Sequence, residues 1–160
     1  ALYMTKDLYK AKDGKWEFIY PKLNDESPIG EFKSYGNGRL LTILTYGNGL
    51  YLSLQAQKDI EKKLGKKIKI IDLMWISDIN YETLLKEISP CKKILIVDEC
   101  RRSGCHGEGI LTNLILKSKT SLNIDLHAAE DSFIPLGVSA TVTLPSEMSI
   151  LNNALDLLNE

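Results

Sequence analysis

The sequence has no long hydrophobic run, no excess of one charge sign and few cysteines. No apolar stretch approaches the roughly 20 residues that a membrane-spanning helix needs. The 20 Lys and Arg nearly cancel the 21 Asp and Glu, and the net charge of -1 argues against a protein that binds nucleic acid by neutralising phosphates. Three cysteines at irregular spacing make no disulfide framework, so we expect free thiols in a reducing, cytoplasmic compartment.

What is present is the composition of one globular domain. A chain of 160 residues, 44% of them hydrophobic, is long enough to bury a sizeable core. Residues 1–30 are polar and loop-rich, and we expect them to form a linker arm that enters a domain spanning residues 31–160. Within the arm, the alternation of Trp16, Phe18 and Tyr20 with other residues predicts a short extended piece.

From residue 40 onward, apolar strand-like runs alternate with amphipathic helix-like segments. Strands are expected at 40–46, 68–73, 93–97 and 124–128, and helices at 50–64, 81–88, 110–117 and after Ser146. This alternation predicts a mainly parallel sheet covered on both faces. Helix ends are expected at Ser146, at Asp78 or Asn80, and at Gly65.

One antiparallel neighbour makes the predicted sheet mixed. The dipeptide Asn37-Gly38 is typical of a hairpin turn. It predicts that residues 31–34 pair antiparallel with the first core strand at 40–46.

Charged residues, thiols and glycines follow the buried strand at 93–97. Because ligand and partner surfaces lie beyond the carboxyl ends of such strands, we expect this loop to face a partner or a cleft. The residues concerned are Glu99, Cys100, Arg101, Arg102 and His106. Two interpretations stay open for the charges that begin at Asp98: local ion pairing, or contact with another domain or subunit.

The thiols in this loop invite two further interpretations. A metal site would need a second Cys/His pair beside Cys100, Cys105 and His106, and the sequence offers none at the usual spacing. A reactive Cys105 thiolate would need an oriented base and an oxyanion site as well. We therefore predict no metal site and no catalytic residue.

Two other features have a structural and a functional interpretation. The turn Gly47-Asn48-Gly49 lies between a strand and a helix and is a possible anion-binding turn, but Leu52 stands where a dinucleotide fingerprint has its third glycine. A tight turn is the preferred interpretation. His127, among apolar neighbours, is expected to be a packed, hydrogen-bonded histidine.

The segment from Asp131 to Gly137 is too apolar for a free loop. Phe133, Ile134, Pro135 and Leu136 are expected to dock against the domain or across an interface.

Several segments in order resemble the C-terminal domain of transketolase, in the form found in thiamine-diphosphate-dependent 2-oxoacid dehydrogenases. The resemblance rests on residues 45–54, 72–75, 97–104, 131–137 and 144–146, and the opening Ala1-Leu2-Tyr3 is similar to the family's linker. The chain departs from the family where Gly104-Cys105 replaces a glycine pair and His106 replaces a hydrophobic residue.

The resemblance implies a three-layer α/β/α domain with a mixed, mostly parallel five-stranded sheet. It implies a parent oxidoreductase that decarboxylates pyruvate or a branched-chain 2-oxo acid and passes the acyl group to a lipoyl-bearing acyltransferase. Thiamine diphosphate and magnesium are then expected in other domains, with no cofactor in this one. The domain's implied roles are homodimer or heterotetramer contact, support of the active-site cleft and acyltransferase docking, so the isolated chain is expected to be inactive. The alternative is a small-anion or nucleotide-binding α/β module that uses the 47–49 turn.

Overall fold

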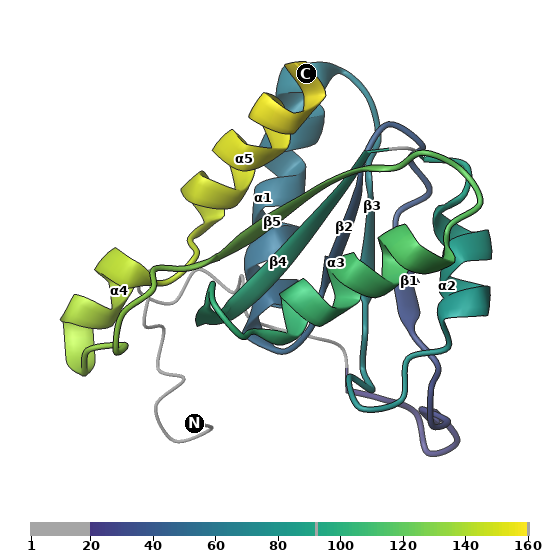
Figure 1. Cartoon of the computed structure of the whole chain (residues 1–160), viewed down its shortest axis with the longest axis horizontal. Coiled ribbons are helices and arrows are strands. Elements are labelled where there is room, and N and C mark those ends of the chain that lie inside the picture. The colour runs from purple at the N-terminus through teal and green to yellow at the C-terminus, as the bar shows by residue number, and fades with distance from the viewer. Residues whose placement is uncertain (1–19, 92, 160) are drawn as a thin grey trace.

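The computed structural model describes residues 20–91 and 93–159, which form one mixed five-stranded sheet with helices on both faces (Figure 1). The strand order is β1-β3-β2-β4-β5. The elements in chain order are β1 (Lys33–Tyr35), β2 (Thr42–Thr45), α1 (Asn48–Leu64), β3 (Lys69–Asp72), α2 (Tyr81–Ile88), β4 (Lys93–Arg101), α3 (His106–Lys117), β5 (Asn123–Ala129), the 3-10 turn η1 (Gly137–Ser139), α4 (Ala140–Thr143) and α5 (Glu147–Asn159).

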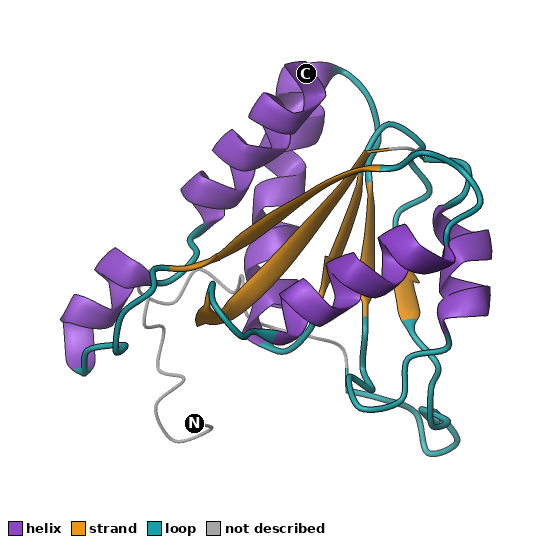
Figure 2. Cartoon of the chain, in the orientation of Figure 1, coloured by secondary structure: helices purple, strands orange, loops and turns teal. Residues whose placement is uncertain are grey.

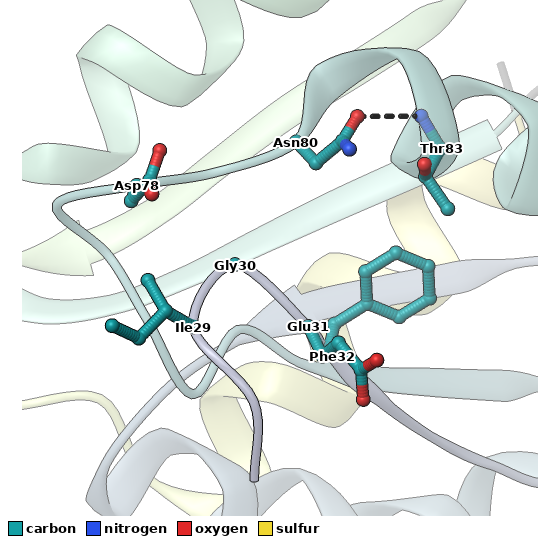
Figure 3. Close-up of a pocket in the computed structure, with 7 residues that line it drawn as sticks. All are labelled: Ile29, Gly30, Glu31, Phe32, Asp78, Asn80 and Thr83. Atoms are coloured by element: carbon teal, nitrogen blue, oxygen red, sulfur yellow. Dashed lines mark hydrogen bonds between the residues drawn. The ribbon is translucent and has the colours of Figure 1, made fainter.

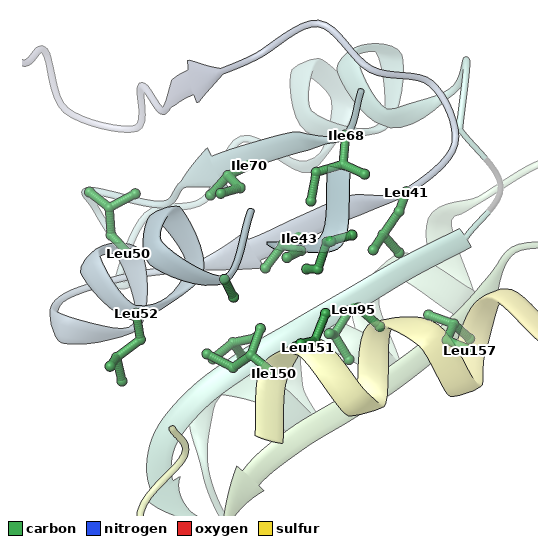
Figure 4. Packing of buried hydrophobic residues seen from close by; sticks show 14 residues of the cluster. Leu41, Ile43, Leu50, Leu52, Ile68, Ile70, Leu95, Ile150, Leu151 and Leu157 are labelled. Atoms are coloured by element: carbon green, nitrogen blue, oxygen red, sulfur yellow. The ribbon is translucent and has the colours of Figure 1, made fainter. Parts of the chain in front are cut away.

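The helices cover the two faces in pairs, as Figure 2 shows. One hydrophobic cluster joins α1 and α5 to one face, and Figure 4 shows its side chains from close by. A second cluster joins α2 and α3 to the other face. Neighbouring strand residues divide between the clusters, as with Leu95 in the first and Ile96 in the second, because successive side chains point to opposite faces. The expected three-layer α/β/α fold with a mixed, mostly parallel sheet is confirmed.

The predicted hairpin is wrong. β1 pairs antiparallel with β3, with Lys33 opposite Asp72, whereas β2 lies between β3 and β4 and is parallel to both. The Asn37-Gly38 dipeptide instead carries the chain across the start of β3. A Cβ on Gly38 would lie 2.0 Å from the Lys67 carbonyl oxygen, so the glycine is needed for this close passage.

The helix ends follow the sequence with one exception. Asn80 caps α2 by accepting from the Thr83 amide at 3.1 Å, and Ser146 caps α5 by accepting from the Ser149 amide at 3.1 Å. Gly65 ends α1 in the left-handed conformation. α3 begins at His106 rather than at residue 110, so two of the glycines assigned to the loop are helical.

The expected extended piece at Trp16 and Phe18 lies outside the described residues, as does most of the linker arm. The exposed residues 20–28 are described, and the Ser27 carbonyl accepts from the Trp75 indole at 3.1 Å. Figure 3 shows a polar hollow nearby, between residues 29–32 and the start of α2. No helix in the described ranges has the length and apolarity to cross a membrane.

Candidate functional site at the carboxyl edge of the sheet

The carboxyl ends of four parallel strands meet at one edge of the sheet. Thr45 of β2 is paired with Asp72 of β3 and Val97 of β4, and Val97 is paired in turn with His127 of β5. The segments that follow these strands therefore gather at this edge. This is where open α/β sheets place ligand and partner surfaces.

The side chain of Asp98, near the end of β4, links this strand to the start of α3 by a hydrogen bond. It is 1% exposed, and its two oxygens accept from the Cys100 and Gly107 amides, both at 2.8 Å. The Gly107 amide belongs to the first turn of α3, where a carboxylate is favoured by the helix dipole. This side chain from the strand accounts for the early start of α3 at His106.

Tyr46 lies over this carboxylate. Burial, and then the nearby Asp98, raises the pKa of Tyr46 well above its usual value. Its Oη is buried but has no partner at hydrogen-bond geometry among the residues described. The His106 ring packs edge-on against the Tyr46 ring, with centroids 6.4 Å apart, and the rest of His106 is exposed. The sequence analysis did not single out Tyr46, although an aromatic residue directly before a glycine turn at a strand end was an available signal.

Glu99 points away from Asp98 to the other layer of helices. Its carboxylate lies beside the side chain of Asn48, the first residue of α1, which acts to lower the pKa of Glu99. Burial raises the pKa of Glu99, and the Asp98 charge acts in the same direction. Two consecutive carboxylates therefore lie at the N-termini of two helices.

This arrangement favours a tight turn over an anion site at Gly47-Asn48-Gly49. Gly47 adopts a positive φ of 56°, and Gly49 is buried so closely that a Cβ would lie 2.2 Å from Thr45 Oγ1. A bound phosphate at this helix start would also meet the carboxylate of Glu99. The Glu99 carboxylate therefore disfavours a bare phosphate at the start of α1.

The three thiols are free, and two of them are buried. Cys105 is buried, and burial raises the pKa of its thiol. Cys100 is exposed, while Cys91 is buried at the opposite end of β4. Within residues 20–91 and 93–159, no group of three His, Cys, Asp or Glu side chains is placed to hold a metal ion.

The two arginines contact the backbone rather than the neighbouring acids. Arg101 Nε donates to the Ser103 carbonyl at 3.3 Å, and Arg102 Nη1 donates to the Leu126 carbonyl at 2.8 Å. In the described part of the chain, no ion pair joins either arginine to Asp98 or Glu99. Local ion pairing is therefore not how this cluster is held.

The segment that contains Phe133 projects from the body of the domain. Phe133 is 94% exposed and Leu136 95%, and Ile134 is half-exposed. Val138 and Val142, which the sequence analysis did not include, are also exposed. The segment returns to the domain where the Glu130 amide donates to the Thr143 carbonyl at 3.0 Å. Phe133 and Leu136 therefore do not pack against the described domain, and contact across an interface stays a prediction for this segment.

His127 is a packed histidine. It is half-buried on β5, and its Nε2 lies 2.8 Å from Ser149 Oγ at the start of α5. Burial lowers the pKa of His127. The contact ties the edge strand to the last helix.

Two curated relatives of this chain are beta subunits of the pyruvate dehydrogenase E1 component. The pyruvate dehydrogenase E1 component subunit beta of Staphylococcus aureus (strain N315) is 25% identical over 149 residues, covering 88% of this chain and 46% of that protein. The same subunit from Staphylococcus epidermidis (strain ATCC 12228) is 26% identical over 145 residues, covering 85% and 44%. This chain spans less than half the length of these relatives.

Solved structures share the fold. A split-gene transketolase, described as an inactive beta4 tetramer, superposes with a TM-score of 0.73 at 15% identity, over 85% of this chain and 44% of that one. A 2-oxoglutarate:ferredoxin oxidoreductase from Magnetococcus marinus gives a TM-score of 0.54 at 15% identity, over 80% and 20%. The model of the transketolase C-terminal domain matches residues 30–132, which is more than half of the sequence. The chain belongs to the transketolase C-terminal domain family.

Proposed function

We propose that this chain is the C-terminal domain of the beta component of a thiamine-diphosphate-dependent 2-oxoacid dehydrogenase. The family match and the pyruvate dehydrogenase beta relatives support this enzyme class. The substrate of the parent enzyme is pyruvate or a branched-chain 2-oxo acid. The domain itself contributes surface and support rather than a catalytic residue.

The exposed segment 132–143 carries this proposal. It contains no charged residue, while four of its apolar side chains are at least 83% exposed. Exposed apolar side chains concentrated on one projecting segment are typical of a protein–protein contact. We propose that this segment contacts another domain or subunit of the parent enzyme, in a homodimer or a heterotetramer.

The loop after β4 has a second role in this proposal. Arg101 and His106 are exposed at the carboxyl edge, and Glu99 is held between β4 and α1. We assign these residues to the wall of the active-site cleft or to docking of the lipoyl-bearing acyltransferase. Both roles need shape and complementary charge.

Thiamine diphosphate and magnesium are expected in other domains of the parent enzyme. The two helix N-termini closest to Asp98 and Glu99 already have carboxylates beside them, which supports this placement. When bound, the cofactor supplies the chemistry of decarboxylation. The residues of this domain support the cleft from outside.

Calorimetry tests the proposal directly. Titration of the 160-residue chain with thiamine diphosphate and Mg²⁺ is expected to give no binding heat, and assays with pyruvate or branched-chain 2-oxo acids to give no turnover. The complete parent enzyme, with all its subunits, is expected to bind the cofactor. Tight binding by the chain alone, or turnover, would overturn the assignment.

A further inference from the structure

β5 is an edge strand of unusual composition for an exposed edge. Among residues 20–91 and 93–159, it pairs only with β4, and it runs for seven residues, Asn123–Ala129. It contains no Pro and no Lys, and Asp125 carries its one formal charge at neutral pH. Strands of this kind invite pairing with another chain unless something covers their free backbone groups.

The backbone groups of alternate β5 residues point away from the sheet. The Ala129 carbonyl accepts from the Arg102 amide, which follows β4, so it faces inward. Because backbone groups alternate along a strand, those of residues 125 and 127 also face β4. Those of Ile124, Leu126 and Ala128 therefore face outward.

The backbone groups of Leu126, the middle one of these three residues, are already hydrogen-bonded to side chains of the same chain. The Leu126 amide donates to Asp125 Oδ1 at 2.8 Å, and the Leu126 carbonyl accepts from Arg102 Nη1 at 2.8 Å. The Leu126 side chain is 4% exposed and packs into the second hydrophobic cluster. An added strand would have to displace a carboxylate and a guanidinium to pair with this residue.

The backbone that carries Arg102 is held in place by two hydrogen bonds. The Arg102 amide donates to Ala129 at 3.0 Å, and the next amide, of Ser103, donates to Asp131 Oδ1 at 2.7 Å. These contacts fold the loop after β4 over the end of β5. The β4–β5 pairing is irregular between Val97 and Arg101, where the loop turns toward the edge.

We propose that Arg102 and Asp125 prevent a second copy of this chain from adding its β5 strand to the outer edge of the sheet. We call these two side chains the edge cover. The proposal does not depend on the enzyme class, because it rests on backbone groups of this domain. It also separates the two arginines: Arg102 covers the edge, and Arg101 stays available to a partner.

The first experiment measures self-association by sedimentation velocity. The variant Arg102→Ala/Asp125→Ala is expected to at least double its weight-average mass relative to wild type as concentration rises. The control Arg101→Ala/Glu130→Ala also removes one charge of each sign beside the edge. Its weight-average mass is expected to equal that of wild type at every concentration. Equal masses for the edge-cover variant and wild type at every concentration would overturn the proposal.

A second variant distinguishes strand pairing from nonspecific aggregation. Ala128→Pro removes an outward amide without touching the inward hydrogen bonds of the ladder. Added to the double variant, it is expected to return the mass to that of wild type. Association that persists with Ala128→Pro would show that the β5 edge is not the contact.

Hydrogen exchange tests the edge cover in single variants that keep their fold. In Asp125→Ala, the Leu126 amide is expected to exchange at least tenfold faster than in wild type, while the inward amide of His127 is unchanged. An unchanged rate at Leu126 would contradict the assignment even if the double variant failed to fold.

Discussion

Replacing Asp98 with Asn is expected to destabilise the domain strongly, although the two side chains have nearly the same shape. Both carboxylate oxygens accept backbone amides at 2.8 Å, in a site that is 1% exposed. Asn has one acceptor oxygen, so its NH2 group must face one of these amides. A lost charge-assisted hydrogen bond, an unsatisfied buried amide and the lost helix-dipole interaction together cost about 2–4 kcal/mol.

The adjacent carboxylate provides the matched control. Glu99→Gln keeps an acceptor for Asn48 and removes a charge whose burial already raises the pKa of Glu99. A raised carboxyl pKa means that the charged form is less favourable in the folded than in the unfolded chain, so stability at pH 7 is expected to stay level or rise slightly.

Urea unfolding followed by circular dichroism separates the two outcomes. With an m value of about 2 kcal/mol/M, the midpoint of Asp98→Asn is expected to fall by about 1–2 M. The midpoint of Glu99→Gln is expected to stay near wild type. If Asp98→Asn unfolds within about 0.5 kcal/mol of wild type, a typical surface value, the reasoning on the β4–α3 connection is refuted.

Three further predictions follow from the same contacts. Gly38→Ala is expected to lose about 3 kcal/mol or more of unfolding free energy, because its Cβ would meet the Lys67 backbone at 2.0 Å. Gly109→Ala, in an open helical position, should gain about 0.5–1 kcal/mol of unfolding free energy. Equal effects of the two substitutions would contradict both predictions. Because burial lowers the pKa of His127, the unfolded chain binds a proton at higher pH than the folded chain does. The free energy of unfolding should therefore fall as the pH drops below about 6.5. In urea titrations, His127→Asn should make the free energy of unfolding less dependent on pH in this range. The contact role of the exposed segment can be tested in a chimera in which this domain replaces the C-terminal domain of a Staphylococcus aureus pyruvate dehydrogenase beta subunit. In the chimera, Phe133→Ser/Leu136→Ser should weaken subunit assembly, measured by gel filtration, without changing the unfolding of the isolated chain. Unchanged assembly would argue against a contact role.

Local patterns predicted most of the fold because they agree with the packing. The core strands and helices have strong apolar periodicity, and the caps at Asn80 and Ser146 act within three residues of themselves. The hairpin prediction failed because Asn37-Gly38 signals a sharp turn but not which strand lies beside it. β3 and β4 each pair with all four residues of β2, which the three-residue β1 could not do.

The candidate site was only partly predictable for a related reason. The sequence places Asp98 and Glu99 at a strand end, but their helix partners come from elsewhere in the chain. Arg102 was expected to face a partner or cleft, which stays a prediction, and nothing in the sequence indicated that its guanidinium would also donate to the β5 backbone at 2.8 Å. Apolar composition marked residues 133–136, but composition alone does not distinguish contact with the same domain from contact with another.

The placement of two successive side chains has a mechanical consequence. Asp98 is coupled to α3 on one side of the sheet, and Glu99 to α1 on the other. The peptide unit between Asp98 and Glu99 therefore links the first turns of both helical layers. The end of β4 contacts the first turns of both helices. We therefore expect a subunit that binds there to shift the first turns of α1 and α3 together.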